Sequence, residues 1–157
     1  MKVRTLELII RPNADIKSRQ WWRQQSRKLR RLFLKYLPDK KIRLFKTSSL
    51  TLLITNNKEI QDLNRKFRRL DKPTDVLSFH LSKKEQIKKK YLGDIVISLQ
   101  AAKVQARRKG HTLRKELRML FIHGYLHLLG YDHKFSKETK TMFSLQNNLL
   151  KELYSKV

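Results

Sequence analysis

The sequence predicts an α+β fold, in which a small mixed sheet packs against helices within a single domain over residues 1–157. Three observations predict it. Short apolar segments, which favour strands, are interspersed with longer segments whose apolar residues recur every three or four positions, as on the buried face of a helix. A length of 157 residues suits one domain with a core large enough to fold unaided. Neither an internal repeat nor a linker divides the chain.

The first half of the chain is expected to alternate strands with helices. Residues 3–10 are predicted as a strand, and residues 15–37 as a long helix that Pro38 helps to end. Segment 42–54 is expected to hold one or two strands. A further helix follows, capped by Asn56 or Asn57. The first helix has residues that can contribute to one apolar stripe, and the second carries three apolar residues: Trp22, Leu29, Phe33, Tyr36 and Leu37 in the first, and Ile60, Leu63 and Phe67 in the second.

The second half continues the alternation. A strand at 76–81 follows the turn at 72–74, a lysine-rich excursion spans 83–90, and another strand covers 92–97. Ser98 is expected to cap a helix that ends near Gly110, and Thr112 to cap the next helix. A final amphipathic helix from about Ser136 carries Met142, Leu145, Leu149 and Leu153 on one face.

The composition restricts the class of protein and its location. With no cysteine in the chain, disulfides and thiolate zinc sites are excluded. No apolar run approaches the roughly 20 residues that span a bilayer, and residues 1–11 lack the continuous apolar centre of a signal peptide. We therefore expect a soluble cytoplasmic protein with no membrane partner.

The charge of the chain favours a polyanionic partner. It carries 38 Lys and Arg against 13 Asp and Glu, a formal net charge of +25, with clusters at 17–31, 83–90 and 103–118. One such cluster alone is typical of a solvated face, and a basic amphipathic helix could equally favour an anionic membrane. The excess over the whole chain favours nucleic acid. Trp21 and Trp22, in the first cluster, are interpreted as core anchors rather than base-stacking platforms.

Segment 123–133, with the sequence HGYLHLLGYDH, predicts a metal site on a helix and the turn after it. His123 and His127 are four residues apart and share one helix face. Gly130 can end the helix in a left-handed turn that presents His133 as a third ligand. One packed histidine would be unremarkable, but three at this spacing favour a metal. The spacing is that of the metzincin pattern H-E-x-x-H-x-x-G-x-x-H, except that Gly124 occupies the position of the catalytic Glu.

Three imidazole ligands leave one coordination position open, as in catalytic zinc sites. Asp132 could supply a fourth ligand or orient His133, and it is equally well explained as a turn residue. Nickel or another divalent ion could replace zinc, because imidazole suits several metals. Asp75 and Asp94 are interpreted as a turn residue and the start of a strand, not as ligands.

Three segments together resemble the YbeY family: LNRKFRRLDKPTDVLSF at 63–79, LGDIVIS at 92–98, and the histidine segment at 123–133. The first resembles that family's P-T-D-V-L-S-F signature and the last its H-G-x-L-H-L-x-G-Y-D-H signature. The likeness covers most of residues 50–150, whereas the N-terminal third offers only a compatible strand–helix pattern. Two departures are the histidine at position 80, where the family often has proline, and the unusually basic segment 83–90. His80 could add an imidazole near the site, but a partly exposed side chain at a strand end is favoured.

The resemblance implies a zincin-like fold and a metal-dependent endoribonuclease that cuts single-stranded RNA. It further implies work on rRNA precursors, notably 16S rRNA 3′-end maturation, and ribosome quality control, with the ribosome or its small subunit as partner. By the same likeness His123, His127 and His133 bind zinc, and Arg68 matches the functionally important arginine.

Elementary chemistry agrees with an RNA substrate. Zinc held by three neutral imidazoles keeps its +2 charge and can lower the pKa of bound water to near 7 without a protein base. Arg68 could pair with a phosphate oxygen in the transition state, and charge alone would allow Arg69 instead. Two other classes stay open: a zinc peptidase, which Gly124 and the basic charge disfavour, and a non-catalytic ribosome assembly factor with structural zinc.

Overall fold

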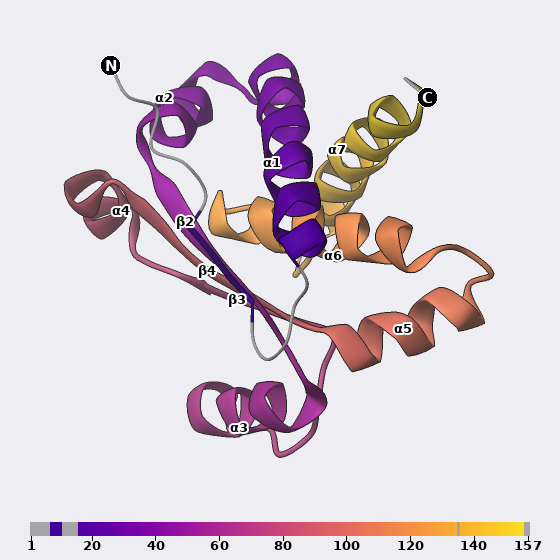
Figure 1. The fold of residues 1–157 in the computed structure, drawn as a ribbon. Coiled ribbons are helices and arrows are strands. Elements are labelled where there is room, and N and C mark those ends of the chain that lie inside the picture. Colours follow the sequence, from indigo (N-terminus) through magenta and orange to yellow (C-terminus); the bar gives the residue numbers. More distant parts are fainter. Residues whose placement is uncertain (1–6, 11–15, 135, 156–157) are drawn as a thin grey trace.

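Four strands form one mixed sheet at the centre of the molecule. The structure, a computed structural model, describes residues 7–10, 16–134 and 136–155. The strand order is β1-β2-β4-β3 (Figure 1). β1 (Glu7–Ile10), β2 (Ser49–Thr55) and β4 (Tyr91–Ser98) run parallel, and β3 (Val76–His80) pairs antiparallel with β4. β3 therefore forms one edge of the described sheet.

Helices connect the strands and cover both faces of the sheet. Figure 1 shows α1, α6 and α7 on one side and α3 on the other. The helices of the described chain are α1 (Ile16–Tyr36), α2 (Asp39–Thr47), α3 (Asn57–Arg68), α4 (Lys83–Lys89), α5 (Leu99–Arg108), α6 (Leu113–Leu128) and α7 (Ser136–Tyr154). None of these helices combines the length and apolar character that a membrane crossing needs.

The alternation of side chains along the strands divides the core into two clusters. The larger cluster contains the inward residues of α1, α6 and α7 together with the sheet residues Leu52, Ile54, Ile95 and Ile97. The smaller one contains Ile60 of α3 with Leu77 and Val96. Successive residues of β4, such as Ile95 and Val96, thus face opposite helix layers. This arrangement places α6 and α3 on opposite sides of the edge strand β3.

Most predicted elements are confirmed. The α+β class, the small mixed sheet, the end of α1 before Pro38 and the caps at Asn56, Ser98 and Thr112 agree with the structure. Residues 3–6 of the first predicted strand lie outside the described residues. Trp22 is 2% exposed and packs edge-on against Phe121, as expected of a core anchor.

One prediction is wrong in part, and the structure adds detail to two others. Segment 42–54 holds only β2, because residues 39–47 form α2, which starts after Pro38 and buries Phe45. The excursion at 83–90 is mostly the helix α4, whose first turn has a capping box between Ser82 and Glu85. Phe67 lies on α3 as expected, but its side chain is 57% exposed.

Candidate metal centre

Helix α6 carries two of the three histidines and crosses the sheet at very short range. Gly124 lies between them along the helix and is buried against the strands. A Cβ atom at this position would lie 2.9 Å from Cγ2 of Ile95 and 3.0 Å from Oγ of Ser78. The Ser78 hydroxyl donates to the Gly124 carbonyl at 3.3 Å. The missing side chain is therefore what lets this turn of α6 approach the sheet.

The end of α6 turns the chain back toward the helix. The Tyr131 N–H donates to the Leu126 carbonyl at 3.0 Å and the Gly130 N–H to the His127 carbonyl at 2.9 Å, which is the Schellman pattern. Gly130 has φ +82°, the left-handed conformation that favours glycine. Lys41 from α2 donates to the Leu129 carbonyl at 2.7 Å. The expected glycine turn is confirmed, and it is held by a residue from another helix.

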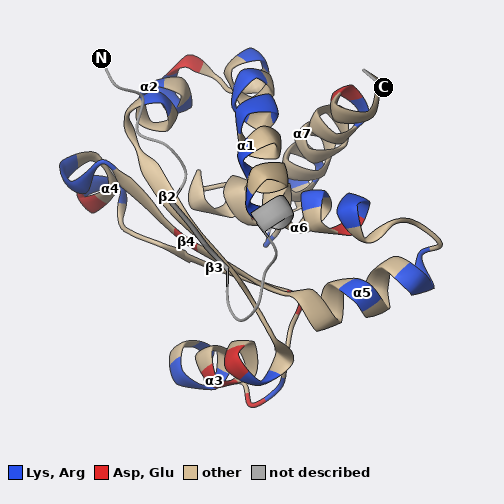
Figure 2. Cartoon of the chain, in the orientation of Figure 1, with Lys and Arg blue, Asp and Glu red and all other residues tan. Residues whose placement is uncertain are grey.

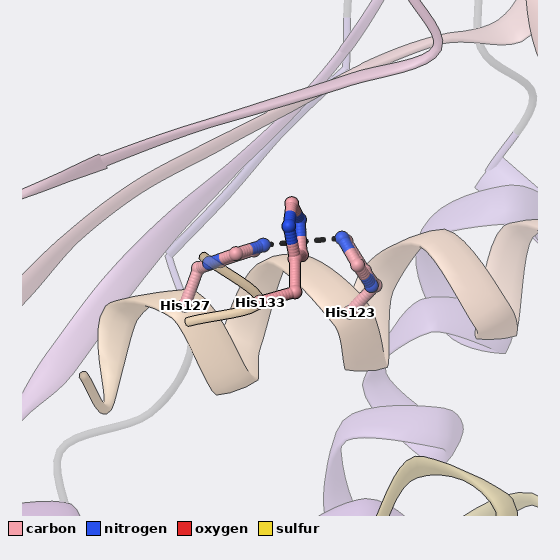
Figure 3. A group of neighbouring side chains, drawn as sticks. All are labelled: His123, His127 and His133. Carbon is pink, nitrogen blue, oxygen red and sulfur yellow. Dashed lines mark hydrogen bonds between the residues drawn. The ribbon is translucent and has the colours of Figure 1, made fainter. Parts of the chain in front are cut away.

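His123, His127 and His133 converge as the sequence predicts (Figure 3). One ring nitrogen from each lies within 4.8 Å of the others, and in the described part of the chain these three residues form the cluster that could hold a metal ion. The Nε2 atoms of His123 and His127 are 3.1 Å apart. Two nitrogen ligands on a tetrahedral zinc ion, each bound at about 2.05 Å, lie about 3.3 Å apart. The pair is thus spaced as two ligands of one ion would be.

Gln146 of α7 fixes the orientation of His123. The Nδ1 atom of His123 lies 3.0 Å from Oε1 of Gln146, which is 7% exposed. When the Nδ1–H donates to this oxygen, Nε2 is left without a proton and faces the other two rings. Sequence reasoning missed Gln146. Its position on the buried side of the last helix, next to Leu145, was the one available signal.

Burial keeps His123 and His127 in their metal-binding protonation state. Burial, together with the neighbouring His123 and His133, lowers the pKa of His127 to about 4. Burial also lowers the pKa of His123, although the bond to Gln146 and the charge of Asp75 act in the opposite direction. Both rings are therefore neutral at neutral pH, and the neutral imidazole is the form that binds metals.

The comparisons with known proteins agree with this site. The family model described as Endoribonuclease YbeY matches residues 15–154, which include all three histidines. The chain belongs to the YbeY family. Relatives named Endoribonuclease YbeY include one from Acholeplasma laidlawii, 48% identical over 102 residues (65% of this chain and 72% of the relative), and one from a Sulfurihydrogenibium species, 40% identical over 131 residues (82% and 86%).

A solved structure shares the architecture of this YbeY-family chain. The solution structure of TM1509 from Thermotoga maritima superposes with a TM-score of 0.66 at 27% identity, covering 96% of this chain and 89% of that one. The match spans nearly the whole chain, including the N-terminal third in which the sequence offered only a compatible strand–helix pattern.

Arg68, the arginine to which the YbeY resemblance points, lies at the C-terminal end of α3. Its Nη2 atom donates to the Ser78 carbonyl at 3.2 Å. Because Ser78 also bonds to Gly124, two hydrogen bonds connect Arg68 through β3 to the helix turn between the histidines. Arg69 instead forms the left-handed cap of α3, with φ +59°. Charge alone could not decide between Arg68 and Arg69 as the candidate, but the two arginines differ in their hydrogen bonds and backbone conformation.

The other polar residues near the YbeY signatures stand outside the cluster. The Asp132 carboxylate accepts the N–H of His133 at 2.7 Å, which is the role of a turn residue. Asp75 accepts from Gln105 of α5 at 2.7 Å, and Asp94 accepts from the Tyr91 hydroxyl at 2.5 Å. His80 is exposed at the end of β3, with its Nδ1 beside the Leu81 carbonyl. None of the four belongs to the ligand cluster of the described residues.

Proposed function

We propose that this protein is a zinc-dependent endoribonuclease that cuts single-stranded RNA. The cluster of three imidazoles carries the proposal. It lies in a chain of net charge +25 that belongs to a family described as an endoribonuclease. His123, His127 and His133 are the proposed ligands. Zinc fits three nitrogen donors and an open position, and nickel is the alternative ion. When bound, such an ion lowers the pKa of a coordinated water molecule and acts as a Lewis acid toward a phosphoryl oxygen.

The surrounding residues suit a phosphodiester better than a peptide. A peptidase of metzincin type needs a glutamate next to the first histidine, but the contacts of Gly124 with Ile95 and Ser78 leave no room there for a longer side chain. Arg68 is proposed as the catalytic arginine. Its planar guanidinium can bind two phosphate oxygens and stabilise the charge that develops as the bond breaks.

The distribution of charge supports RNA as the substrate. Figure 2 shows Lys and Arg along α1, α4 and α5 with few acidic residues between them, whereas α3 carries both signs of charge. In α1, exposed arginines recur every four residues, and the helix contains no Asp or Glu: Arg19, Arg23, Arg27 and Arg31. The apolar face of the same helix is buried in the core, so no face remains to insert into a membrane. A polyanion in solution therefore fits α1 better than a membrane does.

The resemblance to the YbeY family suggests the biological setting. We propose that the protein acts on rRNA precursors in the cytoplasm, in 16S rRNA 3′-end maturation and ribosome quality control. Its partners are then the ribosome or the small subunit, without a membrane. Residues 1–157 are proposed to act as one catalytic domain, in keeping with a core cluster that joins α1, α6, α7 and the sheet.

A His127→Ala variant tests the proposal. Purified wild-type protein, freed of contaminating nuclease, should retain close to one zinc ion per chain and cut single-stranded RNA in preference to duplex RNA. His127→Ala should lose the metal and cleavage while still binding RNA through its basic surfaces. An exposed His80→Ala variant is the matched control and should keep both. If His127→Ala still cut RNA, the proposed site would be wrong. If wild-type protein binds RNA and zinc but never cuts, the non-catalytic assembly factor is the better description.

A further inference from the structure

Phe67 is an aromatic side chain that the fold leaves outside the core. It lies in the last turn of α3, one residue before Arg68, and is 57% exposed. Its ring packs edge-on against Phe79 of β3, with centroids 5.2 Å apart and planes at 63°. Phe79 in turn packs on the smaller core cluster. The Phe67 ring is thus supported from below by a partly buried neighbour, while most of its surface faces solvent.

The surroundings of Phe67 are strongly basic. The Lys66 ammonium lies 5.2 Å from the centre of the Phe67 ring. Among the described residues, no carboxylate lies within ion-pair distance of Lys66, Arg68, Arg69 or Lys72, whereas Arg65 is paired with Asp62 at 2.9 Å. An exposed ring among unpaired cations is unsuited to a lipid or apolar protein surface, which would leave those charges buried. It suits a strand whose bases stack and whose phosphates are anionic.

The edge of β3 separates Phe67 from the histidine cluster. Asp75 and Leu81 form backbone hydrogen bonds to β4. Because bonding alternates along an antiparallel strand, the carbonyl of Ser78 points away from β4, to the free edge. There it accepts from Arg68. The Phe79 side chain faces α3, and the Ser78 side chain faces α6. Phe67 therefore lies on the α3 side of β3, the Arg68 guanidinium at its free edge, and the histidines on the α6 side.

We propose that Phe67 is a stacking platform for one unpaired base of the RNA whose phosphodiester is cut at the histidine cluster. The inference rests on the proposed function and adds to it a subsite for a nucleobase. The strand crosses the free edge of β3, with Arg68 on a phosphate and the Phe67 ring on a neighbouring base. A base in a duplex is already stacked and paired, so it cannot occupy this platform. Phe67 thereby contributes to the preference for single strands.

The test measures RNA binding separately from cleavage. A fluorescent single-stranded RNA of about ten nucleotides, within the usual size of single-strand sites, is titrated against the full chain carrying His127→Ala, which prevents cleavage. Adding Phe67→Leu keeps an apolar contact with Phe79 but removes the aromatic face. We expect binding to weaken about 5- to 150-fold, the range for losing one stacked base. Phe67→Trp should bind at least as tightly as Phe67, and Ile87→Ala, an exposed apolar residue of α4, should change nothing.

A scan with abasic RNA identifies the contact. Oligonucleotides that lack one base at successive positions should include one for which the Phe67→Leu penalty disappears, because the ring then has no base to stack on. The penalty should also be absent with duplex RNA. Equal binding by the proteins with and without Phe67→Leu, or a penalty that persists at every abasic position, would overturn the inference. If wild-type protein failed to cut RNA, that would instead count against the proposed function. The effect of Phe67→Leu on RNA binding would still be valid.

Discussion

Single side chains decide whether the three histidines can bind a metal together. Spacing along the chain brings His123 and His127 to one face of α6, but spacing does not select the ring nitrogen that stays unprotonated. Gln146 makes that selection for His123 by accepting from Nδ1. A buried side-chain amide that hydrogen-bonds to a ligand histidine orients the imidazole ring. Gln146 belongs to α7, a helix that carries none of the three histidines.

Replacing Gln146 should weaken the metal site without unfolding the protein. Gln146→Leu removes the acceptor for His123 but keeps the volume, so we expect zinc affinity to fall about 10- to 100-fold. Gln146→Glu retains an acceptor and should preserve affinity. Competition with a chromogenic chelator measures the zinc affinity of both variants. Asn147→Ala, at an exposed neighbouring position, is the control. Unchanged affinity in Gln146→Leu would show that the hydrogen bond has no part in metal binding.

Arg68 should affect catalysis more than metal binding. If its guanidinium stabilises the transition state, Arg68→Ala should slow cleavage by about a hundredfold, as for loss of one preorganised donor. Zinc content should stay the same. Thermal stability should change little, because the bond to the Ser78 carbonyl is exposed. Arg69→Ala is the matched control and should slow cleavage much less. Equal rates in the two variants, or zinc loss in Arg68→Ala, would contradict the assignment.

Among the elements, α6 is held at both of its ends and in its middle. Its first turn is capped by Thr112, and the fully buried Glu116 pairs with Lys109 at 2.9 Å, which joins α6 to the end of α5. Its middle lies against β3 and β4 at Gly124, and its end is closed by the Gly130 turn. The positions of the histidines are thus set by both helix ends and by the contact with the sheet.

Enlarging Gly124 should separate α6 from the sheet. Gly124→Val places atoms where Ile95 and Ser78 already lie, so we expect the free energy of unfolding to fall by about 2–3 kcal/mol. Gly124→Ala should cost less, since its higher helix propensity offsets part of the crowding. Urea denaturation of the metal-free protein measures the series. A valine variant as stable as the wild type would mean that the close approach is easily relieved.

At the scale of the whole molecule, the dominant property is the positive charge. The clusters lie on α1, on α4, and on α5 with the start of α6, which are spread over several sides of the molecule (Figure 2). Such a distribution suits an RNA partner that is larger than the bond to be cut. It also implies that affinity depends on many phosphate contacts together and on their release of counterions.

RNA binding should therefore weaken steeply with salt. Each phosphate contact with a single strand contributes about −0.7 to the slope of log affinity against log salt concentration. Neutralising the exposed lysines of α4, Lys83, Lys84, Lys88 and Lys89, should reduce that slope if RNA touches this helix. Both sets of residues, these lysines and the exposed arginines of α1, are changed to glutamine, and the salt slope of the α1 arginine variant is compared with that of the α4 lysine variant. A flat salt dependence of the wild type would argue against the basic clusters as the binding surface.

The sequence by itself determined the features that depend on local spacing. Helix caps, the period of buried residues in α1 and α7, the glycine turn after α6 and the convergence of the three histidines all follow from residues close together in the chain. The signature segments also indicate the YbeY family without any information from the fold. That the histidines bind zinc stays a prediction.

Only the tertiary structure decided the features that join distant segments. Local pattern could not distinguish α2 from a strand, because Ile42, Leu44 and Phe45 fit either, and the packing of Phe45 in the core selects the helix. It could not show that Gln146 meets His123, that Ser78 meets Gly124, or that Phe67 stays exposed beside Phe79. Each of these contacts depends on which surfaces the folded chain brings together. The spacing of neighbouring residues does not determine contacts between segments that are distant in the sequence.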